Sequence, residues 1–344
     1  MNICELAKAL GASAEGGENI EITGLCASAA KVQRGDLFFC YKGRSFDSHE
    51  VAARAVRGGA AALVCERKLD LPVPQLIVGD GRAAMTAAAR EFYGRPDRRL
   101  KMVGVTGTNG KTTVTYMLDS IFRAAGRSTG VIGTLGIAFA GRAIAPELTT
   151  PDPICLFSVL REMADCGVEY VFMEVSAHAL AFGKTEGITF EAGIFTNCTQ
   201  DHLDFFADMN EYSGCKKKLF RGGRCLRSVI NSDDATGREI ARFAPAPVTY
   251  GLKNPADVFA VDIAERLDGS TFVINLFDEL YEIGLHMPGE YNVSNALAAA
   301  ACARVLGVKT EVIANGLAAL ERVPGRLECA GKYNGASIFV DFAH

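Results

Sequence analysis

The sequence lacks three features that would assign it to particular classes of protein. It has no basic excess, since its formal net charge is -4. Proteins whose main partner is nucleic acid usually carry clustered basic residues, so nucleic acid is not expected as a partner. No run of about 18 residues is free of charged side chains, and we therefore expect no insertion into a membrane.

Paired cysteines and a secretory leader are also missing. The eleven cysteines are odd in number and form no C-x-x-C pair, which is typical of free thiols in a reducing compartment. No cysteine and histidine cluster has the spacing of a zinc site. The start, "MNICELAKALGA", carries Glu5 and Lys8 in an amphipathic pattern, whereas a signal peptide has basic residues before an apolar core. The sequence thus predicts a cytoplasmic protein.

Apolar runs alternate with helical patterns along residues 1–98. The strand-like runs are "GDLFFCY", "AALVCE" and "PQLIVGD", and the helical patterns are "HEVAARAVRGG" and "RAAMTAAAREFYG". Strands separated by helices indicate an α/β unit. We predict that residues 1–98 form a small N-terminal α/β domain, with a boundary in "GRPDRRL".

A second series of apolar runs predicts a larger α/β domain at residues 99–325. The runs "KMVGVTG", "STGVIGTLG", "EYVFMEVS", "EAGIFTN" and "RSVIN" look like strands buried on both faces. Such strands favour a doubly wound, mainly parallel sheet. Closely spaced runs between 247 and 287 ("VTYG", "VFAVDI", "STFVINLF", "LYEIGLHM") suggest added antiparallel strands. We expect residues 326–344, with the strand-like "ASIFVDFAH", to be the first strand of a truncated third domain.

A strand-to-helix turn, "VGVTGTNGKTT", is the clearest functional signal. Gly107 and Gly110 permit close backbone approach, and a helix is expected to begin at Lys111. Backbone N–H groups at a helix start, together with a lysine, suit nucleotide phosphates, and Thr112 offers a hydroxyl to Mg²⁺. Only the short G-x-x-G-K-T form is present, because Val105 stands where the longer motif has its first glycine. The turn predicts ATP binding, and an ordinary glycine-rich turn is the alternative.

Two polar residues follow other predicted strands. Glu174 ends "EYVFMEVS", and His202 comes just past "EAGIFTN". Ligands of open α/β sheets bind beyond the carboxyl ends of the strands, so a carboxylate and an imidazole could complete a Mg²⁺ shell there. Each alone would more often be a surface acid or a helix cap. The run Lys216, Lys217 and Lys218 would by composition alone be a solvated helix face.

Taken in order, the motifs resemble a known family. They are "GDLFFCYKGRSFDSH", "GVTGTNGKTT", "LTTPDP", "EVSAHAL", "FTNCTQDHLDFF", "YSGCKKKLF", "INSDD", "MPGEYNVSNALAA", "PGRLE" and "VDFAH". This set, which extends over essentially the whole chain, resembles the ATP-dependent Mur ligases of peptidoglycan synthesis, and among them the MurE subfamily.

The resemblance implies a role for each matching position. It implies ATP contacts at Gly107, Thr108, Asn109, Gly110, Lys111, Thr112, Thr113, Asn292, Asn295, Arg326 and Asp341. It implies catalytic roles for Lys111, Lys216 and His202. It implies Mg²⁺ ligands at Thr112, Glu174, His202 and a carbamylated Lys216. It implies that residues 1–98 bind the UDP-linked substrate, and it implies contacts with a UDP-MurNAc-peptide at Ser28, Arg44, Ser45, Phe46, Thr149, Thr150, Ser176 and Lys184. Of these, Ser28 and the segment from Arg44 to Phe46 would lie at the uridine end.

The family also implies a reaction. The γ-phosphate of ATP passes to the terminal carboxylate of UDP-MurNAc-L-Ala-D-Glu, and the amine of diaminopimelate or lysine attacks the acyl phosphate. Such phosphoryl transfer depends mainly on positioning and charge neutralisation. We expect a monomer that works in the synthesis of peptidoglycan precursors.

Several positions depart from the family pattern on the peptide-nucleotide side. Ser28-Ala29-Ala30 replaces Asp-Ser-Arg, Leu148 replaces Asn, Ala177 replaces Ser, and Phe182-Gly183-Lys184 replaces Gln-x-Arg. Lys184 keeps a positive charge without the bidentate geometry of arginine. Either a compensating arrangement or a different acceptor would explain these changes.

Two other functions stay open at this point. One is a nucleotide-binding paralogue without turnover, and the other is a folylpolyglutamate synthase-like ligase. Because the family has a further domain after its "VDYAH" motif, we also expect the 344 residues alone to show no ADP release that depends on an amino acid.

Overall fold

The computed structural model describes residues 1–12, 14–15, 20–44, 46–145, 147–334 and 336–342. The chain groups into two compact units, and each is described by itself. Unit 1 holds Met1–Arg99, Pro151–Glu162 and Phe182–Gly187. Unit 2 holds Leu100–Thr150, Met163–Ala181 and Ile188–His344. Two short segments from within the expected central domain therefore group with the N-terminal residues.

Unit 1 is a five-stranded sheet with helices packed on it. The sheet order is β1-β5-β4-β3-β2, in which β2 to β5 are parallel and β1 is antiparallel to β5. The strands are β1 (Ala14–Glu15), β2 (Gly24–Cys26), β3 (Asp36–Phe39), β4 (Ala62–Cys65) and β5 (Gln75–Ile77). The helices are α1 (Ile3–Leu10), η1 (Ser48–Val51), α2 (Ala52–Arg57), α3 (Gly81–Phe92) and η2 (Pro96–Arg99).

Alternating side chains of β3 fill both faces of this sheet. Leu37 and Phe39 belong to a buried cluster with residues of α1 and α3, whereas Phe38 belongs to a second cluster with residues of α2. Successive side chains of a strand point to opposite faces, so a strand covered on both sides is apolar throughout. This explains why "DLFF" shows no polar alternation.

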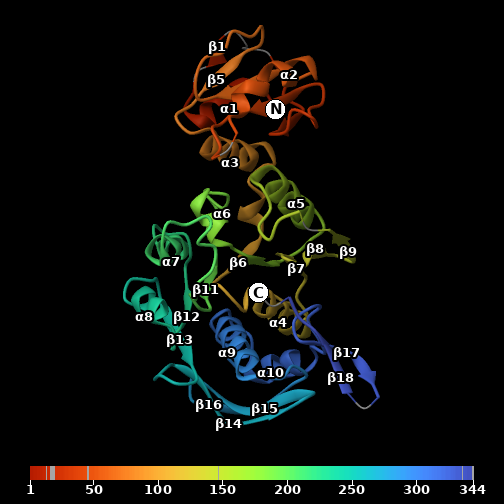
Figure 1. Ribbon diagram of the computed structural model, residues 1–344, viewed down its shortest axis with the longest axis vertical. Coiled ribbons are helices and arrows are strands. Elements are labelled where there is room, and N and C mark those ends of the chain that lie inside the picture. Colours follow the sequence, from red (N-terminus) through yellow and green to blue (C-terminus); the bar gives the residue numbers. More distant parts are fainter. Residues whose placement is uncertain (13, 16–19, 45, 146, 335, 343–344) are drawn as a thin grey trace. The chain divides into compact units, whose positions relative to one another are not determined.

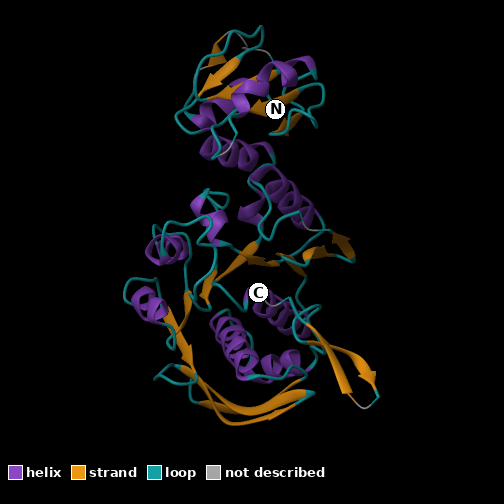
Figure 2. Ribbon diagram, in the orientation of Figure 1, coloured by secondary structure: helices purple, strands orange, loops and turns teal. Residues whose placement is uncertain are grey.

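Unit 2 is built on an eleven-stranded sheet (Figures 1 and 2). Its order is β16-β15-β14-β13-β12-β11-β6-β10-β7-β8-β9. The strands are β6 (Lys101–Thr106), β7 (Thr129–Gly133), β8 (Gly136–Phe139), β9 (Arg142–Ile144), β10 (Tyr170–Glu174), β11 (Ala192–Phe195), β12 (Ser228–Asn231), β13 (Pro247–Gly251), β14 (Val258–Arg266), β15 (Gly269–Leu276) and β16 (Glu279–Leu285). β17 (Glu328–Tyr333) and β18 (Ala336–Val340) form a separate antiparallel pair.

The strand directions confirm the predicted fold class and correct three of its details. The seven strands from β14 to β7 are parallel neighbours, and antiparallel strands extend the sheet at both ends. "VTYG", expected to be antiparallel, is the parallel strand β13, because α8 (Ala235–Ala241) crosses over between β12 and β13. "STGVIGTLG", read as one strand, turns at Thr134 into antiparallel β8. "ASIFVDFAH" has a partner that was not predicted, β17.

The helices assigned to unit 2 include three that pack together. They are α4 (Lys111–Ala124), α9 (Glu290–Val305) and α10 (Thr310–Ala318), and Figure 1 shows α9 and α10 within the curve of β14, β15 and β16. Eleven residues of α9 are buried, among them a run of alanines. Their small side chains let this helix approach the sheet closely.

The remaining helices lie between the strands of unit 2 along the chain. They are α5 (Pro153–Asp165), α6 (Ala177–Ala181), α7 (Met209–Lys217), η3 (Lys218–Phe220) and α8. α5 begins among the residues of unit 1 and ends among those of unit 2. No helix of the described residues is long and apolar enough to cross a membrane.

Candidate functional site

The phosphate loop, Gly107–Thr113, connects β6 to α4 as the sequence predicts. Gly107 has φ 155° and Gly110 has φ 86°, values that L side chains rarely adopt. A Cβ on Gly107 would collide with Thr196 Oγ1, and one on Gly110 would collide with Asn295 Oδ1. Both glycines are therefore needed for the close approach of the neighbouring segments.

The segment that follows β11 holds the loop from one side. The backbone N–H of Thr108 donates to Asn197 O at 2.9 Å, and that of Asn109 donates to Asn197 Oδ1 at 2.9 Å. Thr196 Oγ1 donates in return to Asn109 O at 2.6 Å. These bonds occupy the amides of Thr108 and Asn109. The amides at the start of α4 have no intrahelical partner and could bind an anion.

Lys111 closes over the loop. Its Nζ donates to Gly107 O at 2.9 Å and to Thr108 O at 2.7 Å. Desolvation lowers the pKa of this amine, the charge of Glu174 partly offsets that effect, and Arg326 adds to it. The amine thus lies beside the place where phosphates of a nucleotide would lie against the start of the helix.

Thr112 and Glu174 form a buried pair beside the loop. Thr112 Oγ1 donates to Glu174 Oε1 at 2.9 Å. The carboxylate also accepts the backbone N–H of Thr134 at 2.8 Å and its hydroxyl at 3.1 Å. Glu174 is 1% exposed, and a Cβ on Gly133 would collide with it. The carboxylate is therefore fixed in one position, which is what a metal ligand requires.

Arg326 and Asn295 reach the same loop from the C-terminal part of unit 2. Arg326 Nη2 donates to Thr112 Oγ1 at 3.2 Å, and its buried Nε has no hydrogen-bond partner among the described residues. Asn295, 8% exposed, lies against Gly110, and its Nδ2 donates to Asn292 Oδ1 at 3.4 Å. Asp341 is exposed and accepts the backbone N–H of Leu327 at 2.6 Å. The structure thus brings Asn295 and Arg326 to the loop and places Asp341 directly after β18.

Lys216 is a buried side chain and not part of a solvated face. It is 1% exposed, and its Nζ lies 4.2 Å from the centroid of the Tyr212 ring. Desolvation lowers the pKa of Lys216 to about 7, and the charge of Lys111 contributes to the same shift. Its neighbours in the run differ, because Lys217 is paired with Glu239 at 2.6 Å and Lys218 is exposed.

Tyr212 links Lys216 to the phosphate loop. Its hydroxyl lies 3.2 Å from Thr108 Oγ1, and burial raises its pKa to about 12. The ring centroid of His202, which is exposed and has φ 53°, lies 6.1 Å from that of Tyr212. Lys216 and His202 therefore contact the same ring.

The described residues contain no group of three or more His, Cys, Asp or Glu side chains arranged to hold a metal ion. Thr112 and Glu174 lie together, and His202 lies with Tyr212 and Lys216. Hydroxyl and carboxylate oxygens suit Mg²⁺, which keeps several waters and shares its shell with phosphates of the bound nucleotide. The donor set at Thr112 and Glu174 therefore fits this ion without a complete protein cage.

The residues expected to contact a UDP-linked peptide lie in both units. In unit 2, Thr150 Oγ1 donates to Glu174 O at 2.8 Å and accepts the backbone N–H of Ser176 at 3.1 Å. Thr149 Oγ1 lies 3.1 Å from Thr134 Oγ1. Thr149, Thr150 and Ser176 thus gather around the strand end that carries Glu174.

Unit 1 carries the other expected contacts. Arg44 and Phe46 are exposed, Ser28 is partly buried, and Ser45 lies outside the described residues. Lys184 Nζ pairs with Asp152 Oδ1 at 2.7 Å. The charge that Lys184 was expected to offer a substrate is therefore compensated within the unit.

One of the departures, Phe182, contacts an arginine within unit 1. The Phe182 ring stacks on the guanidinium of Arg82, with 4.4 Å between Cζ and the ring centroid. The Tyr41 ring stacks on the same guanidinium at 4.5 Å. Phe182 thus has a defined contact, although Gln occupies its position in the family pattern.

The sequence analysis missed five residues that shape these sites. They are Arg82, Thr134, Thr196, Asn197 and Tyr212. Thr196, Asn197 and Tyr212 lie in or beside motifs that were recognised, so position in a motif was a usable signal. Nothing in the sequence near Arg82 indicates that two aromatic rings lie against its guanidinium.

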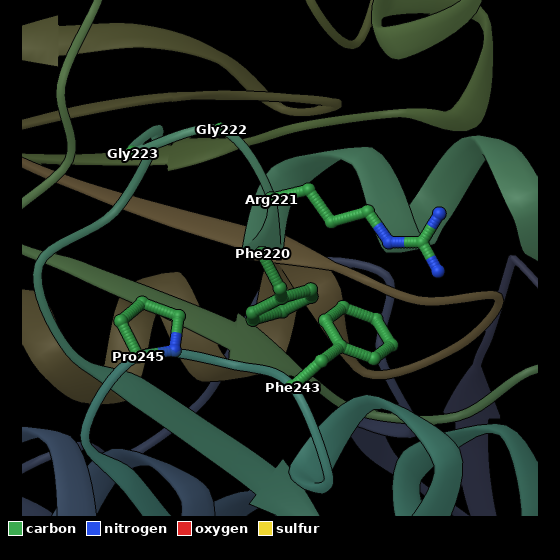
Figure 3. A pocket seen from close by; sticks show the side chains of 6 residues that line it. All are labelled: Phe220, Arg221, Gly222, Gly223, Phe243 and Pro245. Atoms are coloured by element: carbon green, nitrogen blue, oxygen red, sulfur yellow. The ribbon is translucent and has the colours of Figure 1, made fainter.

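A separate pocket of unit 2 contains none of the expected site residues. It is lined by Phe220, Arg221, Gly222, Gly223, Phe243 and Pro245 (Figure 3). The guanidinium of Arg221 lies 4.5 Å from the centroid of the Phe243 ring. The pocket therefore adds nothing to the nucleotide site.

The phosphate loop, the lysine that closes it and the buried Thr112–Glu174 pair define a phosphate-loop protein of the nucleotide-binding class. A family model described as the Mur ligase middle domain matches residues 105–303. The chain belongs to the Mur ligase family.

Two curated relatives carry the same name. A protein of Geobacillus kaustophilus (strain HTA426), "UDP-N-acetylmuramoyl-L-alanyl-D-glutamate--2,6-diaminopimelate ligase", is 41% identical over 336 residues, which cover 95% of this chain and 69% of the relative. The ligase of the same name from Solibacter usitatus (strain Ellin6076) is 40% identical over 330 residues, covering 94% of this chain and 67% of the relative. These similarities confirm the resemblance inferred from the sequence motifs.

Solved structures show the same fold. One titled "Structure of UDP-N-acetylmuramoyl-L-alanyl-D-glutamate--2, 6-diaminopimelate ligase" matches with a TM-score of 0.83 at 23% identity, covering 95% of this chain and 69% of that chain. A folylpolyglutamate synthase of Mycobacterium tuberculosis, solved with ADP, matches with a TM-score of 0.63 at 20% identity, covering 76% of this chain and 66% of that chain. At such identities the likeness concerns the fold alone.

Proposed function

We propose that the protein is an ATP-dependent ligase that adds an amino acid, diaminopimelate or lysine, to UDP-MurNAc-L-Ala-D-Glu in peptidoglycan precursor synthesis. The observation that carries the proposal is the phosphate loop with Lys111 over it and Thr112 paired to buried Glu174. The 41% identity to a ligase with that substrate in its name supports the acceptor and the amino acid. The folate alternative has only the shared fold in its favour.

The residues around the loop suit the binding of ATP phosphates. The first amides of α4 present N–H groups to an anion, and Lys111 adds a positive charge. Thr112 and Glu174 would hold Mg²⁺, which neutralises charge that develops during phosphoryl transfer. Asn295 lies against Gly110 at the end of the loop, which supports its expected role beside the nucleotide.

The reaction in this proposal passes through an acyl phosphate. The substrate carboxylate attacks the γ-phosphorus of ATP and ADP leaves, after which the amine of the amino acid attacks the acyl carbon and phosphate leaves. The protein supplies position and charge for both steps and no nucleophile of its own. Thr149, Thr150 and Ser176 stand next to Glu174, which supports their proposed role near the reacting carboxylate.

Burial of Lys216 supports the proposed carbamylation. An amine must be neutral to attack CO₂, and a pKa of about 7 leaves a large neutral fraction at neutral pH. The carbamate would be an anion, so the repulsion between Lys216 and Lys111 would become an attraction. His202, which contacts the same Tyr212 ring, is the proposed partner of the carbamate at a second Mg²⁺.

A Lys111→Ala variant tests the nucleotide site. We expect its affinity for Mg-ATP, measured by calorimetry, to fall by at least about thirtyfold, because charged hydrogen bonds to phosphate are lost. Lys218→Ala removes an exposed lysine of unit 2 and should bind as the parent does. Unchanged affinity of the Lys111 variant would contradict the site.

The second candidate function is a ligase that acts on an acceptor other than UDP-MurNAc-L-Ala-D-Glu. The observation that favours it is the pairing of Lys184 with Asp152, which compensates the charge expected to meet the peptide. Saturable binding of UDP-MurNAc-L-Ala-D-Glu supports the first candidate. Binding of Mg-ATP without binding of that nucleotide supports the second.

A further inference from the structure

The pocket in Figure 3 lies at the end of the parallel strands opposite to the phosphate loop. Gly223 comes before β12 and Pro245 comes before β13, so both residues lie at the amino ends of these strands. The phosphate loop follows the carboxyl end of β6, and β6, β11, β12 and β13 are parallel neighbours. A ligand in this pocket would therefore bind apart from the nucleotide.

Apolar side chains form much of the pocket wall. The pocket has a volume of about 390 Å³, and its lining includes Phe220, Phe243 and Pro245. Phe220 is 2% exposed and is packed against the sheet, since a Cβ on Gly193 would lie 3.1 Å from Phe220 Cε1. Phe243 is 38% exposed, so its ring is accessible to a ligand. A pocket of this size with flat apolar walls suits a planar ring.

Arg221 brings a positive charge to the same pocket. Its Cζ lies 4.5 Å from the centroid of the Phe243 ring, and Figure 3 shows its side chain extended beside that ring. Arg221 forms no ion pair with a carboxylate of the described residues. A guanidinium that stacks on a ring keeps the N–H donors at its edge available. The charge of Arg221 is therefore positioned and not neutralised within unit 2.

The turn after Arg221 adds two backbone donors. Gly222 and Gly223 have φ 63° and 72°, and both line the pocket. In the part of the chain that the structure describes, neither backbone N–H donates a hydrogen bond to a protein group. Consecutive amides of a turn next to a guanidinium form a set of donors that suits an oxyanion.

We infer that this pocket is a second ligand site, and that its ligand is a planar aromatic compound that carries an oxyanion. The rings of Phe220 and Phe243 would contact the aromatic part, and Arg221 with the glycine amides would bind the oxyanion. The site lies apart from the phosphate loop, so the inference goes beyond the proposed function and does not depend on it.

The test uses 1-naphthyl phosphate as the probe. It is titrated by calorimetry into the whole chain with Mg-ADP present, so that the phosphate loop is occupied. 1-Naphthol and inorganic phosphate each carry one half of the required chemistry, and the probe should bind at least about tenfold more tightly than either.

Two variants separate the charge from the ring. Arg221→Met should weaken 1-naphthyl phosphate by about fivefold or more and leave 1-naphthol unchanged, because only the phosphate needs the guanidinium. Phe243→Leu should weaken both compounds by about threefold or more, because a flat contact surface is lost.

Arg242→Met is the matched control. Arg242 is an exposed arginine next to Phe243 at the end of α8, and it does not line the pocket. This variant should bind the probe as the parent does. The melting temperature and the affinity for Mg-ADP show whether each variant is folded.

Each outcome decides the inference. Absence of probe binding by the parent overturns it, and so does parent-like binding by Arg221→Met. Equal affinities of the parent for inorganic phosphate and the probe also overturn it, since the rings would then contribute nothing. Loss of probe binding in Lys111→Ala would assign the probe to the phosphate loop and overturn the second site. Weaker binding in Arg221→Met and Phe243→Leu, with Arg242→Met unchanged, supports it.

Discussion

The amine of Lys216 shows how position changes the chemistry of one residue. It is buried beside the Tyr212 ring, whereas Lys217 is paired with Glu239 and Lys218 is exposed. Desolvation is the main cause of its lowered pKa, and the charge of Lys111 is the second. Protonation of Lys216 is therefore less favourable in the folded protein than in the unfolded chain, where water solvates the amine.

The pH dependence of stability follows from this shift. The folded pKa of Lys216, about 7, lies below the ordinary 10.5, so the unfolded chain binds the extra proton between these values. Burial of the protonated amine destabilises the folded protein fully at pH values below the folded pKa. This destabilisation disappears as the pH rises toward the pKa of the unfolded chain. Relative to Lys216→Met, the parent should gain roughly 2–3 kcal/mol of unfolding free energy between about pH 7 and pH 9.

Urea unfolding in CO₂-free buffer measures this difference. Lys218→Met provides the matched control, because an exposed lysine should give the same difference from the parent at both pH values. Parallel pH profiles of the parent and Lys216→Met would show that the amine is not desolvated in the folded protein.

Residues of the site differ in how far the sequence could predict them. Gly107, Gly110 and Lys111 were predictable because a short motif fixes the local backbone on its own. Glu174 was predictable because the carboxyl ends of parallel strands meet at one edge. Thr134 and Asn197 were not, since their hydrogen bonds to Glu174 and Asn109 join segments far apart in the chain. What the sequence predicted here is the positions of these residues. Their roles, like those of Ser28, Arg44 and Asp341, stay predictions.

The contact between α4 and α10 depends on a glycine. A Cβ on Gly316 would collide with Ile121 Cα and lie 3.0 Å from Ile121 N. Ser120 Oγ donates to Gly316 O at 2.6 Å across the same contact. Because the obstacle is backbone, the two helices would have to separate to admit a side chain.

Gly316→Ala should therefore lower the free energy of unfolding by about 2–3 kcal/mol, even though alanine favours helix. Gly214→Ala is the control, since Gly214 lies within α7 and a Cβ there meets nothing within 4 Å. That change should stabilise the protein by about 0.5–1 kcal/mol. Urea denaturation measures both, and equal effects of the two substitutions would contradict the close packing of α4 and α10.

Whole elements were predicted where local pattern decides them. Buried strands such as β6 and β10 appear as apolar runs because both faces of the sheet are covered. The direction of β13 could not be inferred from its spacing alone, because a short helix before it permits a parallel crossover. β17 was not predicted, because its sequence, "ECAGKY", has too few apolar residues to give a strand pattern.

At the scale of the whole molecule, the phosphate loop is held by two other stretches that are distant in the sequence. Gly107–Thr113, the segment around Asn197 and the start of α9 with Asn295 are joined by hydrogen bonds or close packing. We expect Mg-ATP to slow amide hydrogen exchange in all three stretches, because a ligand stabilises the segments that hold it. Mass spectrometry of peptides measures this, and protection confined to Gly107–Thr113 would contradict the assembly.

The near-complete burial of α9 affects the order in which unit 2 can fold. Most helices leave one stripe to water, but eleven residues of this helix are buried, and its contacts include β11, β12, β13, β14 and β15. Such a helix gains little by forming alone, since its alanines have nothing to cover them until the strands have assembled. During synthesis those strands emerge from the ribosome earlier than α9. We therefore expect α9 to fold late, when it docks on strands that have already assembled and completes the core of unit 2.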